Sequence, residues 1–429
     1  MERIDVVIVG GGLGGLACAY CLAKEGIQVL VLERGDHPGS KNVTGGRIYL
    51  RPLKPFLPEL LDEAPLERLV TKEAITMMGD GSSFTLQFTS EKFREETPHS
   101  YTILRSRFDK WFGERVMDRG GFVVPQRRVT ELLKEDGRVV GVVSEGEEIP
   151  ADVVIIADGA LSLFAQKAGL RGPLPPRNAA VGIKEVVKLQ PEVIEERFGL
   201  KPGEGMAHLF FGSITHGAFG GGFLYTNSDT ISLGLVIGIE SFLKTQPPTE
   251  THRLLEEFKE REEVAHFIRG GELVEYSAHL IPEGGRTLLS RPYGDGILVV
   301  GDAAGFALNM GITVRGMEFA LASGCMAAQA VKRAKETGDF SASSLAYYED
   351  LLRESFILQD METFRDSLEV VENPRLFNFY PRWLCNILEE IFWIGEGPKE
   401  KISSTLWRGI KEGIFNIAGL KDVWRFRRI

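Results

Sequence analysis

The residues best suited to chemistry are the glycines of an early G-x-G-x-x-G pattern and the acid that follows them. Gly10, Gly12 and Gly15 come directly after the β-branched run of residues 5–9. Glycine is required where bare main-chain N–H groups and a helix N-terminus must approach a pyrophosphate without a Cβ in the way. Glu33 follows Gly10 by 33 − 10 = 23 residues, a distance at which a carboxylate can accept a hydrogen bond from a ribose hydroxyl. The pattern predicts a dinucleotide site, and the alternative is a strand-to-helix turn that binds nothing.

Further acids stand at the ends of predicted strands. Asp158 and Gly159 end the hydrophobic run that starts at residue 152, and Asp302 follows the apolar strand of residues 296–300. An aspartate at a strand end can hold a ribitol hydroxyl. The small-residue helix predicted next aims its positive N-terminus at a phosphate or at the electron-rich edge of a ring. The sequence offers no His/Asp/Ser group or paired carboxylates for acid–base or nucleophilic catalysis, which favours chemistry centred on a cofactor.

The elements that must position these residues are predicted from hydrophobic periodicity. Residues 5–9 and 29–32 are predicted as buried strands and residues 16–24 as the helix between them, which makes a βαβ unit. Residues 130–143 and 148–156 are predicted as three strands, the first two joined by an Asp-Gly turn. The nucleotide motif thus belongs to an α/β sheet.

Two segments beside this unit could reach the ligand. Residues 35–49 are rich in Gly, Pro, Ser and Asn, so they are predicted as a loop that either reaches the working end of a cofactor or is plain surface. Residues 104–119 are predicted as a packed helix, in which Arg105 or Arg107 could face a phosphate or stay solvated.

The middle of the chain changes character. Residues 179–239 alternate between apolar and polar residues around Gly-rich turns, which predicts an antiparallel sheet inserted into the nucleotide fold. Gly220 and Gly221 lie within one of these strands, where glycine marks either a bulge or the close approach of backbone to a ligand. A Pro-containing linker at 246–250 precedes a charged helix predicted over 251–269.

The tail, residues 373–429, gathers four of the five tryptophans and two apolar helical stripes with basic residues between and after them. Such helices suit a membrane interface, and the alternative is a cap packed on the protein's own core or on a partner. The four tryptophans are Trp383, Trp393, Trp407 and Trp424. The first stripe consists of Leu384, Ile387, Leu388, Ile391 and Phe392, and the second of Leu406, Trp407, Ile410, Ile414 and Ile417. The basic residues are Lys411, Lys421, Arg425, Arg427 and Arg428.

Composition narrows the functional classes. The net charge of −10 argues against a nucleic-acid surface, which needs a basic footprint. Four cysteines make a disulfide framework improbable, and Cys18 and Cys21, although spaced C-x-x-C, are predicted as packing residues of the first helix. No uncharged apolar stretch of about 18 residues occurs, so any membrane contact is expected from the surface.

Several motifs together resemble known flavoproteins. The R-x-x-F-D pattern at 105–109, Ala157–Gly159 and Gly301–Ala303 occur in the order seen in flavoproteins with two dinucleotide-binding domains, which include aromatic hydroxylases and geranylgeranyl reductases. More narrowly, the chain resembles the FixC-type electron transfer flavoprotein:quinone oxidoreductases in five segments that span nearly its whole length, namely residues 41–47, 220–226, 275–285, 301–316 and 372–381.

The resemblance implies an α/β fold with a Rossmann-like FAD-binding domain, an inserted antiparallel β-sheet domain and a helical, aromatic-rich C-terminal segment. Residues 1–178 and 286–372 would form the FAD-binding domain, and residues 179–285 the quinone or substrate domain. Residues 373–429 would form an amphipathic segment that contacts membrane or partner.

The resemblance also implies an activity and partners. Non-covalent FAD would accept electrons from the alpha/beta pair of an electron transfer flavoprotein and pass them to membrane quinone, with the protein peripheral on the cytoplasmic side of the cell membrane. An iron–sulfur cluster would reside only on a separate ferredoxin-like, FixX-type subunit, because this chain lacks the four-cysteine domain of the mitochondrial relatives. The chain would then be one subunit of a FixABCX or Etf-type complex, with electron bifurcation as an option. The rivals are an NAD(P)H-dependent flavin reductase or monooxygenase of the geranylgeranyl reductase type, and a non-catalytic flavin scaffold.

Motifs and resemblance together define the expected site residues. The cofactor residues are Gly10, Gly12, Gly15 and Glu33 at the AMP half, Asp302 at the ribitol, Thr44, Gly45, Ile312 and Thr313 around the ring, Arg105 at the pyrophosphate, and Arg34, Val129, Asp158, Gly159 and Gly311 along the rest of the molecule. Gly220, Gly221 and Tyr225 are expected at the quinone, and Phe219 stands where the mitochondrial relatives have tyrosine. No metal ligand and no acid–base residue is expected.

Overall fold

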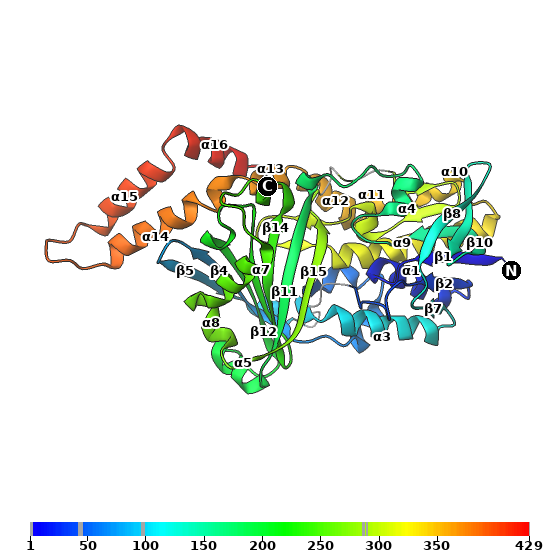
Figure 1. Ribbon diagram of the computed structural model, residues 1–429, viewed down its shortest axis with the longest axis horizontal. Helices are drawn as coiled ribbons and strands as arrows, with labels where there is room; N and C mark the ends of the chain where they lie inside the picture. The colour runs from blue at the N-terminus through cyan, green and yellow to red at the C-terminus, as the bar shows by residue number, and fades with distance from the viewer. Residues whose placement is uncertain (1–2, 42–45, 96–98, 285–287, 289–290, 429) are drawn as a thin grey trace.

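Two sheets lie next to each other along the long axis of the molecule (Figure 1). The computed structural model describes residues 3–41, 46–95, 99–284, 288 and 291–428. One sheet has eight strands and the other nine, and each has its own hydrophobic core. The N-terminus lies at one end of the molecule, and the helices of residues 379–426 lie at the other end.

The eight-stranded sheet is the Rossmann-like part, and it confirms the predicted α/β class. Its order is β16-β17-β10-β1-β2-β7, with β17 to β7 parallel and β9 joining β10 to β8. Strand β1 is central and buried, as expected for a parallel strand covered by helices. The strands are β1 (Ile4–Val9), β2 (Val29–Leu32), β7 (Phe122–Val124), β8 (Val129–Glu135), β9 (Arg138–Ser144), β10 (Glu147–Ile156), β16 (Tyr293–Gly294) and β17 (Ile297–Val299).

Three helices frame this sheet: α1 (Leu13–Lys24), α3 (Arg105–Asp118) and α9 (Met317–Thr337). Helices α1 and α9 pack so closely that a Cβ on Gly324 would lie 2.2 Å from the carbonyl oxygen of Gly14. Cys18 is buried in this contact, and burial raises the pKa of its thiol, which fits the predicted packing role.

The nine-stranded sheet has the order β15-β11-β14-β13-β12-β4-β6-β3, with β5 on β4. Its pairs are antiparallel except β12 with β4, which is parallel. Four of its strands come from residues 46–103, so this sheet is larger than the insertion predicted from residue 179 onward. The strands are β3 (Gly46–Tyr49), β4 (Leu69–Met78), β5 (Ser83–Thr89), β6 (Ser100–Ile103), β11 (Ala179–Lys188), β12 (Glu204–Gly212), β13 (Gly220–Thr226), β14 (Thr230–Gly238) and β15 (Glu272–Pro282).

Shorter elements connect the sheets and cover them. They are η1 (Arg51–Leu53), α2 (Pro58–Glu63), η2 (Glu91–Arg94), α4 (Leu163–Lys167), η3 (Pro176–Asn178), α5 (Pro191–Phe198), η4 (Ser213–Thr215), α6 (Ile239–Phe242), α7 (Thr251–Glu260), α8 (Glu262–Ile268), η6 (Gly301–Ala304), β18 (Leu308–Asn309), β19 (Val314–Arg315), α10 (Ala342–Leu345), α11 (Tyr347–Glu354), α12 (Phe356–Thr363), α13 (Ser367–Val371) and η7 (Pro374–Leu376).

Two predicted elements differ from the structure. The helix expected over 251–269 is two helices, because Arg261 is extended (φ −63°, ψ 136°) and ends α7 before α8 begins. The end of the predicted loop 35–49 is strand β3, whose backbone is held by pairing with β6 and not by local sequence preference.

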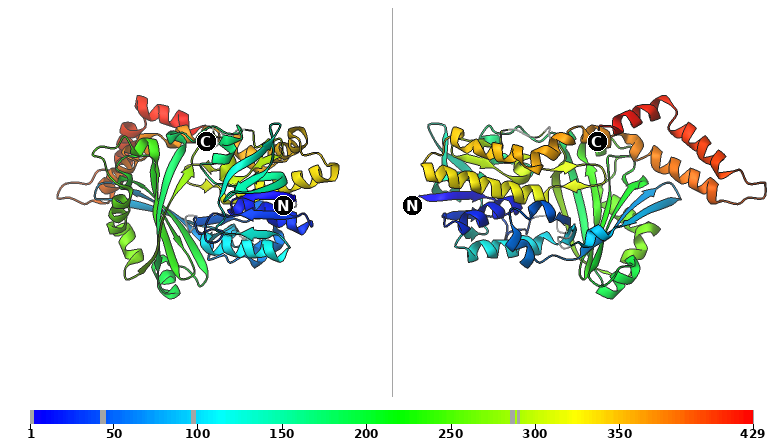
Figure 2. Two further views of the ribbon diagram at one scale, coloured as in Figure 1. Left: turned by 45° about the vertical axis from the view of Figure 1, so that its right-hand side comes forward. Right: turned by 180° about the vertical axis from the view of Figure 1, so that it is seen from behind.

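The tail forms a helical hairpin followed by a return helix: α14 (Phe379–Phe392), α15 (Ile402–Gly413) and α16 (Ile417–Phe426). Trp383 Nε1 donates to the carbonyl oxygen of Gly409 at 2.9 Å, and a Cβ on Gly413 would lie 2.2 Å from the Trp383 ring. The second predicted stripe is divided between α15 and α16, because Asn416 caps α16 by accepting a hydrogen bond from Gly419 N at 2.8 Å. The right-hand view of Figure 2 shows the hairpin extending beyond the body.

Candidate functional site

One large cavity occupies the junction of the two sheets. Its volume is about 1240 Å³, above the 300–1,000 Å³ typical of a pocket for one small ligand. Its walls come from the carboxyl ends of β1, β2 and β10, from the turn after β17, and from β11, β13, β14 and β15. Ligands of open α/β sheets bind outside the carboxyl ends of the strands, so the cavity lies where the fold predicts it.

The glycine turn after β1 forms the floor of this cavity. Gly10 has φ +106°, and Gly12 ends the turn at the first residue before α1, with no side chain capping the helix. A Cβ on Gly12 would meet no protein atom within 4 Å, so the space beside it is open. Gly15 is not among the residues that line the cavity, and a Cβ on it would lie 2.2 Å from the carbonyl oxygen of Gly10.

Glu33 lies at the end of β2 and faces the same turn. Its Oε2 accepts from Gly11 N at 2.7 Å and its Oε1 from Gly35 N at 2.6 Å. A carboxylate has about four acceptor positions, so each oxygen can still accept from a ribose hydroxyl. Arg34 and Val129 also line the cavity here.

The two arginines on α3 point to different places. Arg105 lines the cavity and forms a two-point ion pair with the buried Asp109, Nε to Oδ1 at 2.8 Å and Nη2 to Oδ2 at 2.7 Å. Arg107 is 57% exposed and pairs with Glu67. Of the two arginines, Arg105 is the one that lines the cavity.

The acids at the strand ends also reach the cavity. Asp158 and Gly159 follow β10, and Asp158 Oδ2 accepts from Phe164 N at 3.2 Å. Asp302 lies in η6, where Arg171 Nη1 donates to its carbonyl oxygen at 3.0 Å. Burial raises the pKa of Asp302, and the positive charges of Arg105 and Arg171 oppose that rise.

The segment after η6 brings a second helix N-terminus to the cavity. Gly311 (φ +90°), Ile312 and Thr313 line it, and α9 begins just beyond, after Gly316, without a side-chain cap. A Cβ on Gly316 would also meet no protein atom within 4 Å. Thr44 and Gly45, expected at the same end, lie outside the described residues.

The expected quinone residues line the far end of the cavity. A Cβ on Gly220 would lie 2.1 Å from the carbonyl oxygen of Val236, and one on Gly221 would lie 2.7 Å from that of Phe210. The register of β13 with β14 is continuous there, so these glycines mark close backbone packing and not a bulge. Tyr225 stacks on Phe223 at 5.4 Å between ring centroids, and burial raises the pKa of its hydroxyl.

Family models match three parts of the chain. Residues 5–75 match the model of FAD-dependent oxidoreductases, residues 179–281 the ubiquinone-binding domain of ETF-QO, and residues 369–429 the C-terminal domain of the ETF-QO/FixC family. Among curated proteins, the chain is 43% identical to the probable electron transfer flavoprotein-quinone oxidoreductase YdiS of Escherichia coli K12, over 98% of this chain and 97% of that protein. It is 43% identical to FixC of Escherichia coli K12 and 40% identical to FixC of Bradyrhizobium diazoefficiens, each over at least 98% of both chains.

The chain belongs to the ETF-QO/FixC family. Solved structures agree on the fold of this ETF-QO/FixC protein. A geranylgeranyl bacteriochlorophyll reductase-like protein from Thermoplasma acidophilum superposes with a TM-score of 0.72 at 23% identity over 96% of each chain. A flavin-dependent brominase superposes with a TM-score of 0.61 at 17% identity. The chain is therefore an FAD-dependent oxidoreductase by family.

The residues of this ETF-QO/FixC protein fit a dinucleotide flavin. Two helix N-termini without side-chain caps face one cavity, and each is preceded by a glycine beside open space. The first turn of a helix leaves N–H groups without internal partners, and these groups bind phosphate and other electron-rich oxygens. In the described chain, no three His, Cys, Asp or Glu side chains gather as they would around a metal ion.

Some residues of the cavity were not predicted from the sequence. Arg47 Nη1 donates to Glu73 Oε2 at 3.0 Å, and its guanidinium lies 4.7 Å from the centroid of the Tyr49 ring. These residues lie on β3 and β4, whose position in the second sheet had no local signal. Glu283 and Asn309 were also missed, although both fall within segments that resemble the family.

Proposed function

We propose that this ETF-QO/FixC protein carries electrons from an electron transfer flavoprotein to a membrane quinone, through one non-covalently bound FAD. The observation that carries the proposal is the single cavity that joins the glycine turn of Gly12 to Gly221, in the segment that matches the ubiquinone-binding model. A flavin and a quinone held in one cavity can exchange electrons without a protein acid or nucleophile.

In this proposal the chain's own groups hold the cofactor. The amides at the start of α1 bind the pyrophosphate, Glu33 accepts from the ribose, and Asp302 accepts from the ribitol. Arg105 adds positive charge near the phosphates. The flavin supplies the redox chemistry, and the N-terminus of α9 with Gly311 stabilises negative charge on the ring edge.

The quinone would enter through an apolar wall that the tail shares with the cavity. Phe377 and Phe426 line the cavity together with Phe219, whose ring contacts Phe377 at 5.8 Å between centroids. Phe426 is the last residue of α16 and is also exposed on the surface. A quinone with a long apolar tail could therefore pass from the outer surface to Gly220 and Gly221.

The hairpin gives the protein its membrane contact in this proposal. At its tip Phe392, Trp393 and Ile394 are 79%, 71% and 72% exposed, which is unusual for neighbouring large apolar residues. Aromatic bodies at the headgroup level and cations beside them are typical of helices that lie on a bilayer. None of the helices that the structure describes is long and apolar enough to span one.

The same proposal gives the partners and the location. The alpha/beta pair of an electron transfer flavoprotein donates the electrons, and a small ferredoxin-like subunit carries any iron–sulfur cluster. The complex sits on the cytoplasmic face of the cell membrane as a peripheral assembly of the FixABCX type, and bifurcation would need the whole assembly.

The test is steady-state reduction of a water-soluble quinone by the FAD-loaded protein, with a reduced electron transfer flavoprotein as donor. We expect quinone reduction that needs both proteins and is not supported by NADH or NADPH alone. Rapid reduction of the bound flavin by a nicotinamide would instead favour the geranylgeranyl reductase type. Failure of the flavin to turn over with any donor would favour a scaffold.

Membrane contact is tested separately by flotation with vesicles that contain anionic lipid. The variant Phe392→Ser with Trp393→Ser removes the exposed tip without touching the cavity. We expect the double variant to leave the vesicle fraction and to keep its activity with a water-soluble quinone. Unchanged vesicle binding would refute the assignment of the hairpin tip.

A further inference from the structure

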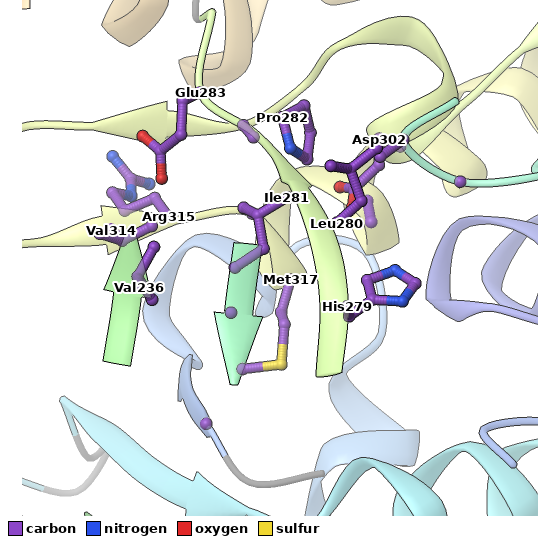
Figure 3. Close-up of a pocket in the computed structure, with 18 of the residues that line it drawn as sticks. Val236, His279, Leu280, Ile281, Pro282, Glu283, Asp302, Val314, Arg315 and Met317 are labelled. Atoms are coloured by element: carbon purple, nitrogen blue, oxygen red, sulfur yellow. The ribbon is translucent and has the colours of Figure 1, made fainter. Parts of the chain in front are cut away.

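A buried carboxyl group on the cavity wall takes no part in the function proposed above. Glu283 directly follows β15, is 4% exposed and lines the cavity. Figure 3 shows its side chain next to Pro282 at the end of the strand, among the lining residues Val314 and Arg315. Burial of a charged carboxylate is energetically costly, so the presence of an acid at this buried position requires an explanation.

Two hydrogen bonds connect this acid to the segment expected at the flavin ring. Asn309 Nδ2 donates to Glu283 Oε2 at 3.0 Å, and Asn309 Oδ1 accepts from Gly311 N at 2.8 Å. Gly311 begins the turn that carries Ile312 and Thr313, and all of these residues line the same cavity. The protonation of Glu283 and the charge at this turn therefore affect each other.

Within residues 99–284 and 291–428, the charged groups on the adjoining elements pair with one another, and Glu283 is not among their partners. The pairs are Arg315 of β19 with Glu318 and Asp360, and Arg177 of η3 with Glu372. His279 lies four residues before Glu283, on β15. Its imidazole is neutral, because burial and, after it, the positive charges of Arg105 and Arg34 lower its pKa. Burial raises the pKa of Glu283 to about 7, and the hydrogen bond from Asn309 only partly opposes this.

We propose that Glu283 takes up one proton when the cofactor in the cavity gains two electrons and releases it when those electrons leave for quinone. The inference rests on the proposed function. Above pH 7 Glu283 would be a carboxylate before the electrons arrive; two electrons would then enter with two protons, one taken up at the cofactor and one by a carboxylate oxygen of Glu283. A quinone that takes up two electrons and two protons becomes quinol, so the balance closes without another reactant.

The decisive experiment is the pH dependence of the flavin midpoint potential, measured with redox mediators in the FAD-loaded full chain. Each proton taken up with two electrons adds about 30 mV per pH unit to the slope. Between pH 7 and 9 we expect a slope of about 60 mV per unit for the wild type and about 30 mV for Glu283→Gln. The two potentials should coincide at pH 6, where the wild-type acid is protonated in both states.

Two further variants keep the result interpretable. Glu283→Asp retains a titrating acid and should retain the steeper slope. Glu372→Gln makes the same chemical change on the partly exposed partner of Arg177, outside the cavity, and should follow the wild type at every pH. Equal slopes for wild type and Glu283→Gln would overturn the inference while leaving the proposed function intact. Failure of the wild type to hold FAD would overturn the proposed function itself.

A measurement without FAD gives a second readout. The infrared spectrum of the FAD-free wild type should show the C=O stretch of a buried carboxylic acid, which is lost as the pH rises from 6 to 9. Glu283→Gln should lack this band at every pH. Persistence of the band in the variant would assign it to another acid and contradict the proposal.

Discussion

Gly12, which precedes α1, and Gly15, in the first turn of α1, are expected to act differently, the first in cofactor binding and the second in packing. A matched pair of substitutions tests this. Gly12 has φ −83° and ψ 178°, which alanine adopts readily, and its Cβ would meet no protein atom within 4 Å. Gly12→Ala should therefore change the unfolding free energy of the FAD-free protein by less than about 1 kcal/mol, the usual range for a residue that precedes a helix.

The same methyl group would occupy space that the pyrophosphate needs. Displacing the phosphate from even one main-chain N–H removes a charge-assisted hydrogen bond of about 1.5–3 kcal/mol. We expect FAD to bind Gly12→Ala roughly 10- to 100-fold more weakly, since about 1.4 kcal/mol corresponds to a factor of ten. Titration of flavin fluorescence against the protein measures this affinity.

Gly15→Ala should show the reverse pattern. Its Cβ would lie 2.2 Å from the Gly10 carbonyl oxygen and 3.1 Å from Ile8 Cγ2, so backbone must move. Overpacking of this kind typically costs about 1–3 kcal/mol, which denaturant unfolding without FAD measures. If Gly12→Ala bound FAD as the wild type does, or unfolded as easily as Gly15→Ala, the assignment of Gly12 to the ligand would be wrong.

Three further substitutions probe buried charges. Lys184 is 0% exposed, lies 3.7 Å from Glu275, and burial lowers its pKa to about 7. Above pH 7 the unfolded chain therefore keeps this lysine protonated, whereas the folded protein loses the proton. Between pH 7 and 10 the unfolding free energy of the wild type should thus rise by about 4 kcal/mol relative to that of Lys184→Met. Parallel curves of unfolding free energy against pH for the two proteins would contradict this. Arg105→Ala removes the two-point ion pair with buried Asp109 and should lower the unfolding free energy by about 3–5 kcal/mol, with or without FAD; a loss confined to FAD binding would show that the pair is not structural. Asp422 accepts from Asn373, Arg375 and Tyr380, each at 2.7 Å, so Asp422→Asn should speed amide hydrogen exchange in α16 while β1 is unaffected; equal protection in both proteins would disprove the anchoring role.

Local sequence determines the parts of the site that lie within one βαβ unit. Gly10, Gly12 and Glu33 are fixed by a strand, a turn and a helix that follow one another in the chain, so spacing alone predicts their meeting. The same holds for Asp302, which directly follows an apolar strand. These predictions need no knowledge of distant contacts.

The parts that could not be predicted depend on contacts between distant segments. Strands β3 to β6 join the second sheet only because β4 pairs with β12, more than 130 residues later in the chain. The burial of Glu283 likewise comes from Asn309 and from the walls of the cavity, and the residues next to it in the sequence do not predict that burial. The break at Arg261 interrupts a sequence that favours helix throughout, so local propensity gave no warning.

The most direct test of electron transfer is a single turnover under anaerobic conditions. The FAD-loaded protein is reduced with one equivalent of dithionite and then mixed with a water-soluble quinone while the flavin absorbance is followed. We expect full and rapid return of the oxidised flavin spectrum with one quinol formed per flavin, and no comparable reoxidation by NAD⁺ or NADP⁺. A flavin that stays reduced in the presence of excess quinone would contradict it.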